Sequence, residues 1–220
     1  MKCLLAAAIA CIALSDVARA ESPVAVVEDV QGKVTGAEFM DYVVPGQVIK
    51  LGPGGKIVLG YMKSCWEETI SGIGTVIVGA EQSAVHLADF KANKVACDAS
   101  QSQRLGKEYS ESAAALVRSL KDDSTSPPLV LHGVSPIIAT SERGKLIVER
   151  TDMKGERYEI DVTSSARTHN KFVDLASTNI ALKPGGIYSA TIKSRRIVFR
   201  IDSDAAPGTG AVIGRLVNLR

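Results

Sequence analysis

Acidic side chains and a histidine are the residues of this 220-residue chain whose types could carry catalysis. Glu67, Glu68, His86 and Asp98 fall within one glycine-rich stretch and could form a hydrolase site from positions that are separated in sequence. Paired acids for glycoside cleavage must face each other across about 5 to 10 Å in unequal environments, which adjacency in sequence does not supply. We therefore predict that the protein is not an enzyme, with a hydrolase whose site is unrecognised as the alternative.

Three further patterns resemble known motifs, and each lacks a required part. The glycine-rich residues 51–55 lack the following Lys-Ser/Thr and helix of a phosphate cradle, so they indicate a hairpin turn. Asp202 and Asp204 lack the later ligands of a calcium loop. Residues 132–135, His-Gly-Val-Ser, lack the strand-turn-helix context of a nucleophile elbow. We expect no cofactor and no metal, and we expect Glu67-Glu68 and Asp202/Asp204 to be solvated loop residues.

The first 20 residues have the features of a secretory signal peptide. Lys2 precedes an apolar run over residues 3–14, and a short polar segment ends in Ala18-Arg19-Ala20. A membrane anchor needs about 20 apolar residues, which is more than this run contains. Lipidation at Cys11 is a second alternative, although it leaves only a short apolar region before the cysteine. We predict export with cleavage after Ala20, and no transmembrane segment in the mature chain.

Cleavage there leaves two of the four cysteines, Cys65 and Cys97. An even cysteine count in an exported chain predicts a disulfide. Neither zinc binding nor a nucleophilic thiol is favoured, since no CxxC or HxxxH set lies nearby and no histidine is singled out as a base. We predict a disulfide that closes a loop of about 33 residues.

The charge balance argues against nucleic acid as a partner. Without Lys2, Arg19 and Asp16 the mature chain carries 24 basic and 23 acidic residues, a formal charge of +1. Nucleic-acid binding needs lysines and arginines clustered on one face, whereas the basic residues here are scattered among carboxylates.

Residues 21–99 show short β-type runs separated by glycine turns. Gly32, Gly46, Gly54 and Gly55 mark turns in which glycine permits positive φ. Val85, Leu87 and residues 95–97 are expected to complete the module as strands, with residues 89–93 as a polar turn. The spacing predicts a small β-domain.

This stretch resembles the FecR-type periplasmic domain. The likeness rests on Gly32-Lys-Val34, on residues 45–49 (Pro-Gly-Gln-Val-Ile) and on residues 54–59 (Gly-Gly-Lys-Ile-Val-Leu), and it covers roughly residues 24–98. The resemblance implies a β-rich domain in the periplasm. Signalling members of the family have a cytoplasmic segment and a transmembrane helix where this chain has a leader, so contact with a cytoplasmic sigma factor does not carry over.

Residues 100–122 predict an amphipathic helix, because apolar side chains recur three and four residues apart from Leu105 to Leu120. Its apolar stripe could pack on a β-domain or bind a partner, and both alternatives stay open. Residues 123–128, which end in two prolines, predict a linker.

Residues 129–220 contain seven or eight short strand patterns, which predict an immunoglobulin-like β-sandwich. Tyr188 follows a Pro-Gly-Gly turn and resembles the tyrosine whose hydroxyl bonds the backbone at a sheet corner in such sandwiches, so we assign it a structural role. Arg215 interrupts an apolar strand at residues 212–219 and is expected to face solvent or an acidic partner.

These patterns favour an exported, non-enzymatic binding or structural protein of the cell envelope. Its partner would be an envelope protein or polymer whose identity the sequence does not give. An envelope signalling or sensor adaptor and an envelope hydrolase are the alternatives.

Overall fold

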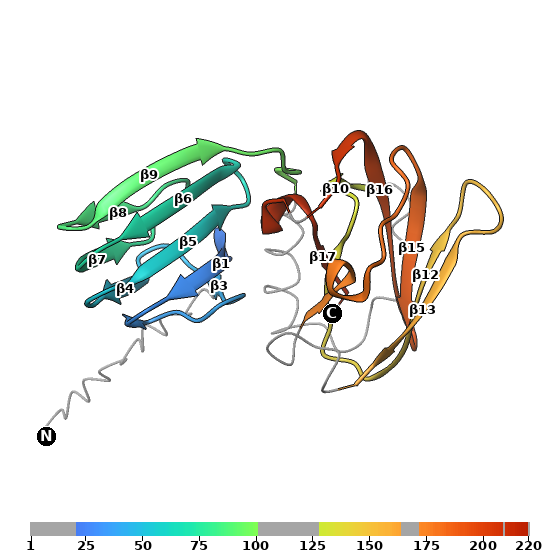
Figure 1. Ribbon diagram of the computed structural model, residues 1–220, viewed down its shortest axis with the longest axis horizontal. Helices are drawn as coiled ribbons and strands as arrows, with labels where there is room; N and C mark the ends of the chain where they lie inside the picture. Colours follow the sequence, from blue (N-terminus) through green and yellow to red (C-terminus); the bar gives the residue numbers. More distant parts are fainter. Residues whose placement is uncertain (1–20, 101–127, 164–171, 209, 220) are drawn as a thin grey trace, which may run out of the picture.

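The computed structural model describes residues 21–100, 128–163, 172–208 and 210–219. These residues form several β-sheets in two groups, one on each side of Figure 1, which confirms the expectation of a mainly β protein. The expected signal peptide at residues 1–20 lies outside the described residues. So do the expected helix and linker, apart from Ser100 and Pro128 at their ends.

The N-terminal module consists of two antiparallel sheets. The first has the strand order β3 (Tyr42–Val43), β1 (Ala25–Gln31), β5 (Lys56–Tyr61), β6 (Trp66–Ser71) and β9 (Asp89–Lys94). The second has the order β2 (Val34–Thr35), β4 (Val48–Leu51), β7 (Gly74–Ile77) and β8 (Ala84–His86). Alternate residues of both sheets, such as Ile49, Ile57, Ile70 and Val76, meet in one buried cluster, as expected for two sheets that pack face to face.

The expected polar turn at residues 89–93 is wrong, because these residues belong to the edge strand β9. Phe90 lies opposite Ile70 of β6, and among the described strands the outer edge of β9 has no partner. Lysines are common on such edges, which explains the polar composition that indicated a turn. Residues 95–97 are not a strand, and Leu87, expected inside one, lies in the turn before β9 with a φ of 66°.

Glycine is required where the turns of this module approach one another. Gly32 has a φ of 65°, and a Cβ added to it would lie 2.1 Å from the carbonyl oxygen of Gly54. Gly54 has a φ of 68°, and a Cβ on Gly55 would lie 2.8 Å from the carbonyl oxygen of Lys33. Gly46, in another turn, has a φ of 79°. The β1–β2 and β4–β5 turns therefore pack backbone against backbone.

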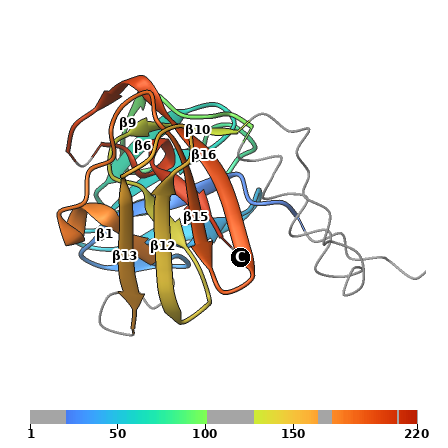
Figure 2. The same cartoon turned by 90° about the vertical axis from the view of Figure 1, so that its right-hand side faces the viewer.

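The C-terminal domain also has two sheets. The larger has the order β10 (Leu129–Gly133), β16 (Arg195–Ala206), β15 (Ile187–Ile192), β12 (Gly144–Arg150) and β13 (Arg157–Val162), and its last four strands stand side by side in Figure 2. The smaller has the order β14 (Phe172–Asp174), β11 (Ile137–Ala139) and β17 (Leu216–Asn218). Two 3-10 turns, η1 (Leu175–Thr178) and η2 (Val212–Gly214), adjoin the smaller sheet. This arrangement is of the β-sandwich type.

The bounds of two elements in this domain differ from the sequence prediction. Residues 212–219 begin as η2 and not as a strand, and β16 extends to Ala206, so Asp202 and Asp204 lie in a strand and not in a loop. Arg215 is only 4% exposed. Its guanidinium donates to the carbonyl oxygen of Ser135 at 2.7 Å and to Asp174 at 3.3 Å. Of the two environments expected for Arg215, the acidic partner is therefore the one observed.

The predicted disulfide between Cys65 and Cys97 is confirmed, with the two Cα atoms 5.7 Å apart. Cys65 immediately precedes β6, and Cys97 follows β9, the neighbour of β6. The bond therefore ties the edge strand to its neighbour at the point where the chain leaves the module.

Replacing both cysteines by alanine should lower the free energy of unfolding by about 3 to 4 kcal/mol, because the bond closes a loop with a sequence separation of 32. Urea denaturation of the wild type and of Cys65→Ala/Cys97→Ala measures this difference. Wild-type protein treated with a reductant is the matched control and should lose a similar amount. Equal midpoints for all three samples would contradict a stabilising role.

Candidate functional site

Glu67 and Glu68 are adjacent on β6, so their side chains lie on opposite faces of the sheet. Glu68 is fully buried and accepts a hydrogen bond from the backbone N–H of Ser83 at 3.0 Å. Burial raises the pKa of Glu68, while the hydrogen bonds from Ser83 oppose the rise. The Ser83 hydroxyl also lies 2.8 Å from that of Tyr61. Glu68, expected as a solvated loop residue, instead holds the β7–β8 loop against the first sheet.

The four residues proposed as parts of a hydrolase do not meet in one site. His86 is exposed on β8, the edge strand of the second sheet. Asp98 follows the disulfide and accepts a hydrogen bond at 3.0 Å from the N–H of Val130, in the first strand of the C-terminal domain. Among the described residues, no group of three or more His, Cys, Asp or Glu side chains could hold a metal ion.

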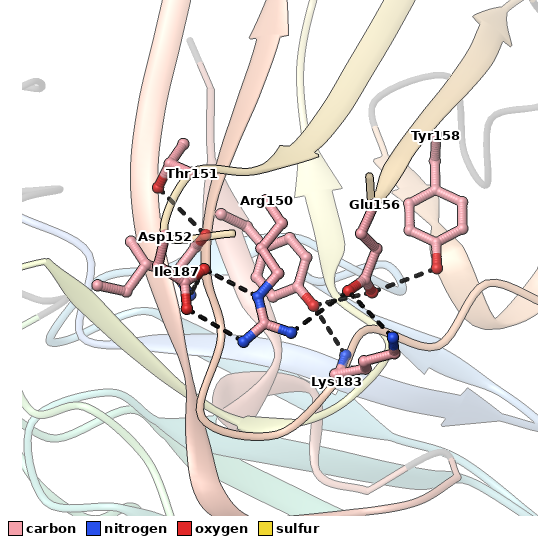
Figure 3. Close-up of polar contacts among 8 residues, drawn as sticks. Arg150, Thr151, Asp152, Glu156, Tyr158, Lys183 and Ile187 are labelled. Carbon is pink, nitrogen blue, oxygen red and sulfur yellow. Dashed lines mark hydrogen bonds and ion pairs between the residues drawn. The ribbon is translucent and has the colours of Figure 1, made fainter. Parts of the chain in front are cut away.

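A polar network lies at the β12–β13 turn of the C-terminal domain (Figure 3). Arg150 donates to both carboxylate oxygens of Asp152, at 2.8 and 3.0 Å, and its guanidinium is 3.5 Å from Glu156. The hydrogen bond from Arg150 lowers the pKa of Asp152 to about 2. Glu156 also accepts hydrogen bonds from the hydroxyls of Tyr188, at 2.9 Å, and Tyr158, at 3.3 Å.

Tyr188 links this network to the neighbouring turn. Its hydroxyl accepts a hydrogen bond at 2.9 Å from the backbone N–H of Lys183, five residues earlier, and its ring is fully buried. Burial raises the pKa of Tyr188 to about 12, so the hydroxyl keeps its proton and can donate it to Glu156. Tyr188 therefore joins the turn before β15 to the turn after β12.

The hollow beside this network, about 380 Å³ in volume, is rich in cations but offers little unmatched charge. Its lining includes Arg150, Lys154, Arg157 and Lys183 together with Glu156. Arg150 is paired with Asp152. Arg157 forms ion pairs with Glu149 on the neighbouring β12 and with Glu159 on its own strand. The network therefore fits a role in stabilising the β12–β13 hairpin better than a role in binding a ligand.

The two domains meet in an apolar cluster. It contains Val26, Met40 and Met62 from the N-terminal module, and Ile137, Ala139, Phe172, Val212, Ile213 and Leu216 from the C-terminal domain. Gly60 makes room for this contact, because a Cβ there would lie 2.6 Å from the Ile213 side chain and 2.2 Å from Glu28. We call this contact the domain seam.

Glu28 is a charged residue at the domain seam, and sequence reasoning missed it. Its carboxylate accepts hydrogen bonds from the N–H groups of Val212, at 3.1 Å, and Ile213, at 2.9 Å. Ala211, the residue that precedes η2, has no side chain that could accept a hydrogen bond from the first N–H groups of η2. Glu28 of the N-terminal module accepts these bonds instead, and it therefore acts as the N-cap of η2. Burial raises the pKa of Glu28 to about 7, the two N–H donors oppose the rise, and Glu67 adds to it. The signal in the sequence was an acidic residue within the valine-rich strand β1, which indicates a carboxylate with a buried partner.

The turn end of the N-terminal module comprises the β1–β2, β4–β5, β6–β7 and β8–β9 turns. It lies at the end opposite the C-terminal domain (Figure 1). Leu87 in the β8–β9 turn is 96% exposed, and Ile73 in the β6–β7 turn is 62% exposed. A Cβ added to Gly74 would lie 2.3 Å from the carbonyl oxygen of His86, so these two turns are in direct contact. Two large aliphatic side chains therefore project from neighbouring turns.

No family model, curated protein or solved structure matches the chain. In the part of the chain that the structure describes, no helix has both the length and the apolar character needed to cross a membrane. The fold and the sites define a two-domain β protein with a disulfide, an apolar seam capped by a carboxylate and an exposed aliphatic turn end.

Replacing Tyr188 by phenylalanine should lower the free energy of unfolding by about 1 to 2 kcal/mol, because the N–H of Lys183 and the carboxylate of Glu156 each lose a partner. Tyr158→Phe is the matched control, since it removes one longer hydrogen bond to the same carboxylate. Urea denaturation should show the larger shift for Tyr188→Phe. Equal shifts would contradict a special role for Tyr188.

Replacing Glu28 by glutamine should remove a pH dependence of stability. The pKa of Glu28 is about 7 in the folded protein and ordinarily 4.5, so the folded state binds more protons between these values. We therefore compare the free energy of unfolding of the wild type with that of Glu28→Gln. The difference, wild type minus variant, should fall as pH rises from about 4.5 to about 7 and then level off. Urea denaturation across this range provides the measurement.

Glu67→Gln is the control for the pH experiment. The groups that face Glu28 are the Glu67 carboxylate of β6 and the N–H groups of η2, and Glu67 raises the pKa of Glu28. Its replacement should narrow the pH range over which stability changes. A constant difference between the wild type and Glu28→Gln at every pH would show that Glu28 does not titrate in this range.

Proposed function

We propose that the protein is an exported, non-enzymatic binding protein of the cell envelope, that it acts in the periplasm, and that its N-terminal module is a FecR-type domain. The signal-peptide pattern of residues 1–20 supports export, and the Cys65–Cys97 disulfide fits an oxidising compartment. The mature chain is expected to begin at Glu21.

The observation that carries a binding role is the turn end. Most large aliphatic side chains of the module are buried, whereas Leu87 and Ile73 project into solvent from adjacent turns. Isolated exposed apolar residues need no explanation, but neighbouring ones on the tips of turns mark interaction sites. The seam and the disulfide lie at the other end, so the turn end stays available to a second molecule.

The proposal is tested in two steps on the full chain expressed with its own N-terminus in a Gram-negative host. Osmotic shock should release protein whose mass begins at Glu21 and whose two cysteines resist alkylation. Leu5→Arg, which interrupts the apolar run of the leader, is the control and should stay in the cytoplasm with alkylatable thiols. Wild-type protein that keeps its leader or its free thiols would overturn the proposed location.

The second step introduces a photo-crosslinking residue at position 87. An envelope component should be captured there, and none at position 153 on the C-terminal domain, where Met153 is 60% exposed and serves as a matched exposed apolar residue. Equal capture at both positions, or none at either, would overturn the assignment of binding to the turn end.

A further inference from the structure

The conformation of Leu87 is unfavourable both for its backbone and for its side chain. Its φ of 66° is left-handed, a region that glycine and asparagine adopt readily and that is costly for a branched side chain. Its side chain is 96% exposed, so burial in the chain offsets nothing. A residue held in this way indicates a role outside the folded chain itself.

Ile73 has a similar position in the neighbouring turn. It lies between Gly72, with a φ of 101°, and Gly74, whose missing side chain lets the two turns touch. Phe90, which is 39% exposed, follows the Leu87 turn on β9. Aliphatic and aromatic groups are therefore collected at one end of the module, on turns whose backbones are tightly packed.

Three lysines lie in or near the turns at the same end of the module. Lys33 lies in the β1–β2 turn, Lys50 is one residue before the end of β4, and Lys91 lies near the start of β9; all three are exposed. Within residues 21–100, no ion pair engages them, whereas Lys56 is paired with Asp29 at 3.4 Å. One carboxylate without an ion pair within residues 21–100, that of Asp89, lies two residues before Lys91. It balances only one of the three lysines. The turn end thus carries an excess of positive charge.

Projecting aliphatic side chains with lysines at the same end of the module match the chemistry of a membrane interface. The aliphatic groups enter the boundary between headgroups and acyl chains, while the ammonium groups contact lipid phosphates. A stable protein interface buries about 800 Å² on each partner, and the tips of four short turns offer a narrow surface. The charge and shape of the turn end therefore favour a lipid surface over a protein.

We propose that the turn end docks on membranes that contain anionic phospholipid, with Leu87 and Ile73 inserted and Lys33, Lys50 and Lys91 on the headgroups. This inference rests on the proposed function and names the partner of the same surface. Attachment through two side chains and a few charges is reversible, unlike that of a spanning helix.

The test is co-sedimentation of the mature protein with vesicles of phosphatidylcholine, alone or mixed with phosphatidylglycerol. Binding should require phosphatidylglycerol and weaken as salt rises, because headgroup contacts are screened. Leu87→Asn should reduce the partition coefficient about tenfold, as expected for losing a buried leucine side chain. Asparagine suits a positive φ, so this variant should fold at least as well as the wild type.

Two controls separate the contributions. Met153→Asn removes an exposed apolar side chain from the C-terminal domain and should leave vesicle binding unchanged. Lys33→Gln/Lys91→Gln should lower the affinity and flatten its salt dependence while Leu87 is intact. Urea denaturation of each variant confirms that it is folded.

The outcomes distinguish this inference from the proposed function. Equal binding of the wild type and Leu87→Asn, or no binding to phosphatidylglycerol vesicles, would overturn lipid docking. If position 87 then crosslinks to an envelope protein, the binding role stands with a protein as its partner. If the chain is not exported, the proposed function fails whatever the vesicles show.

Discussion

The covalent tie between Cys65 and Cys97 is the constraint on which the N-terminal module depends. The edge strand β9 pairs with one neighbour only and carries mostly polar residues, so its own burial contributes little to holding it. The disulfide fixes the end of β9 to the start of β6, close to Met62 in the domain seam. At the other end of the same strands, glycine turns pack on one another. Both the seam and the turn end therefore rely on β6 and β9 keeping their register.

The domain seam combines apolar burial with one titratable capping group. Met40, Met62 and Ile213 supply the apolar contact, and Glu28 supplies the hydrogen-bond acceptor that η2 lacks within its own cap. A buried acceptor is worth most when its donors have no alternative, as is the case for N–H groups at the start of a helical turn. Because its pKa is raised to about 7, this acceptor changes charge near neutral pH, which makes the seam sensitive to pH.

Local patterns predicted much of the fold but little of its polar interior. Short strand patterns predicted the β-rich C-terminal domain, glycines predicted the turns, and the cysteine count predicted the disulfide, because each depends on neighbours in sequence or on compartment. Glu68 and Arg215 were placed less well, since each is buried by a partner distant in sequence, Ser83 and Asp174 respectively. For the same reason β9 was mistaken for a turn: its strand conformation comes from pairing with β6 and not from its own residues. The seam involving Glu28 depends on two domains and has no local signature.

The non-glycine residues with positive φ show why the turn end is the most informative surface. Met40 is buried at the seam, Cys65 is held by the disulfide, Lys193 makes an ion pair, and Asn179 closes a 3-10 turn with its N–H group. Each has a contact within the described part of the fold. Leu87 is 96% exposed and has neither burial nor a favourable residue type in its support. Sequences agree with their folds at most levels, and a residue that conflicts at two levels is expected where function, not stability, has selected it.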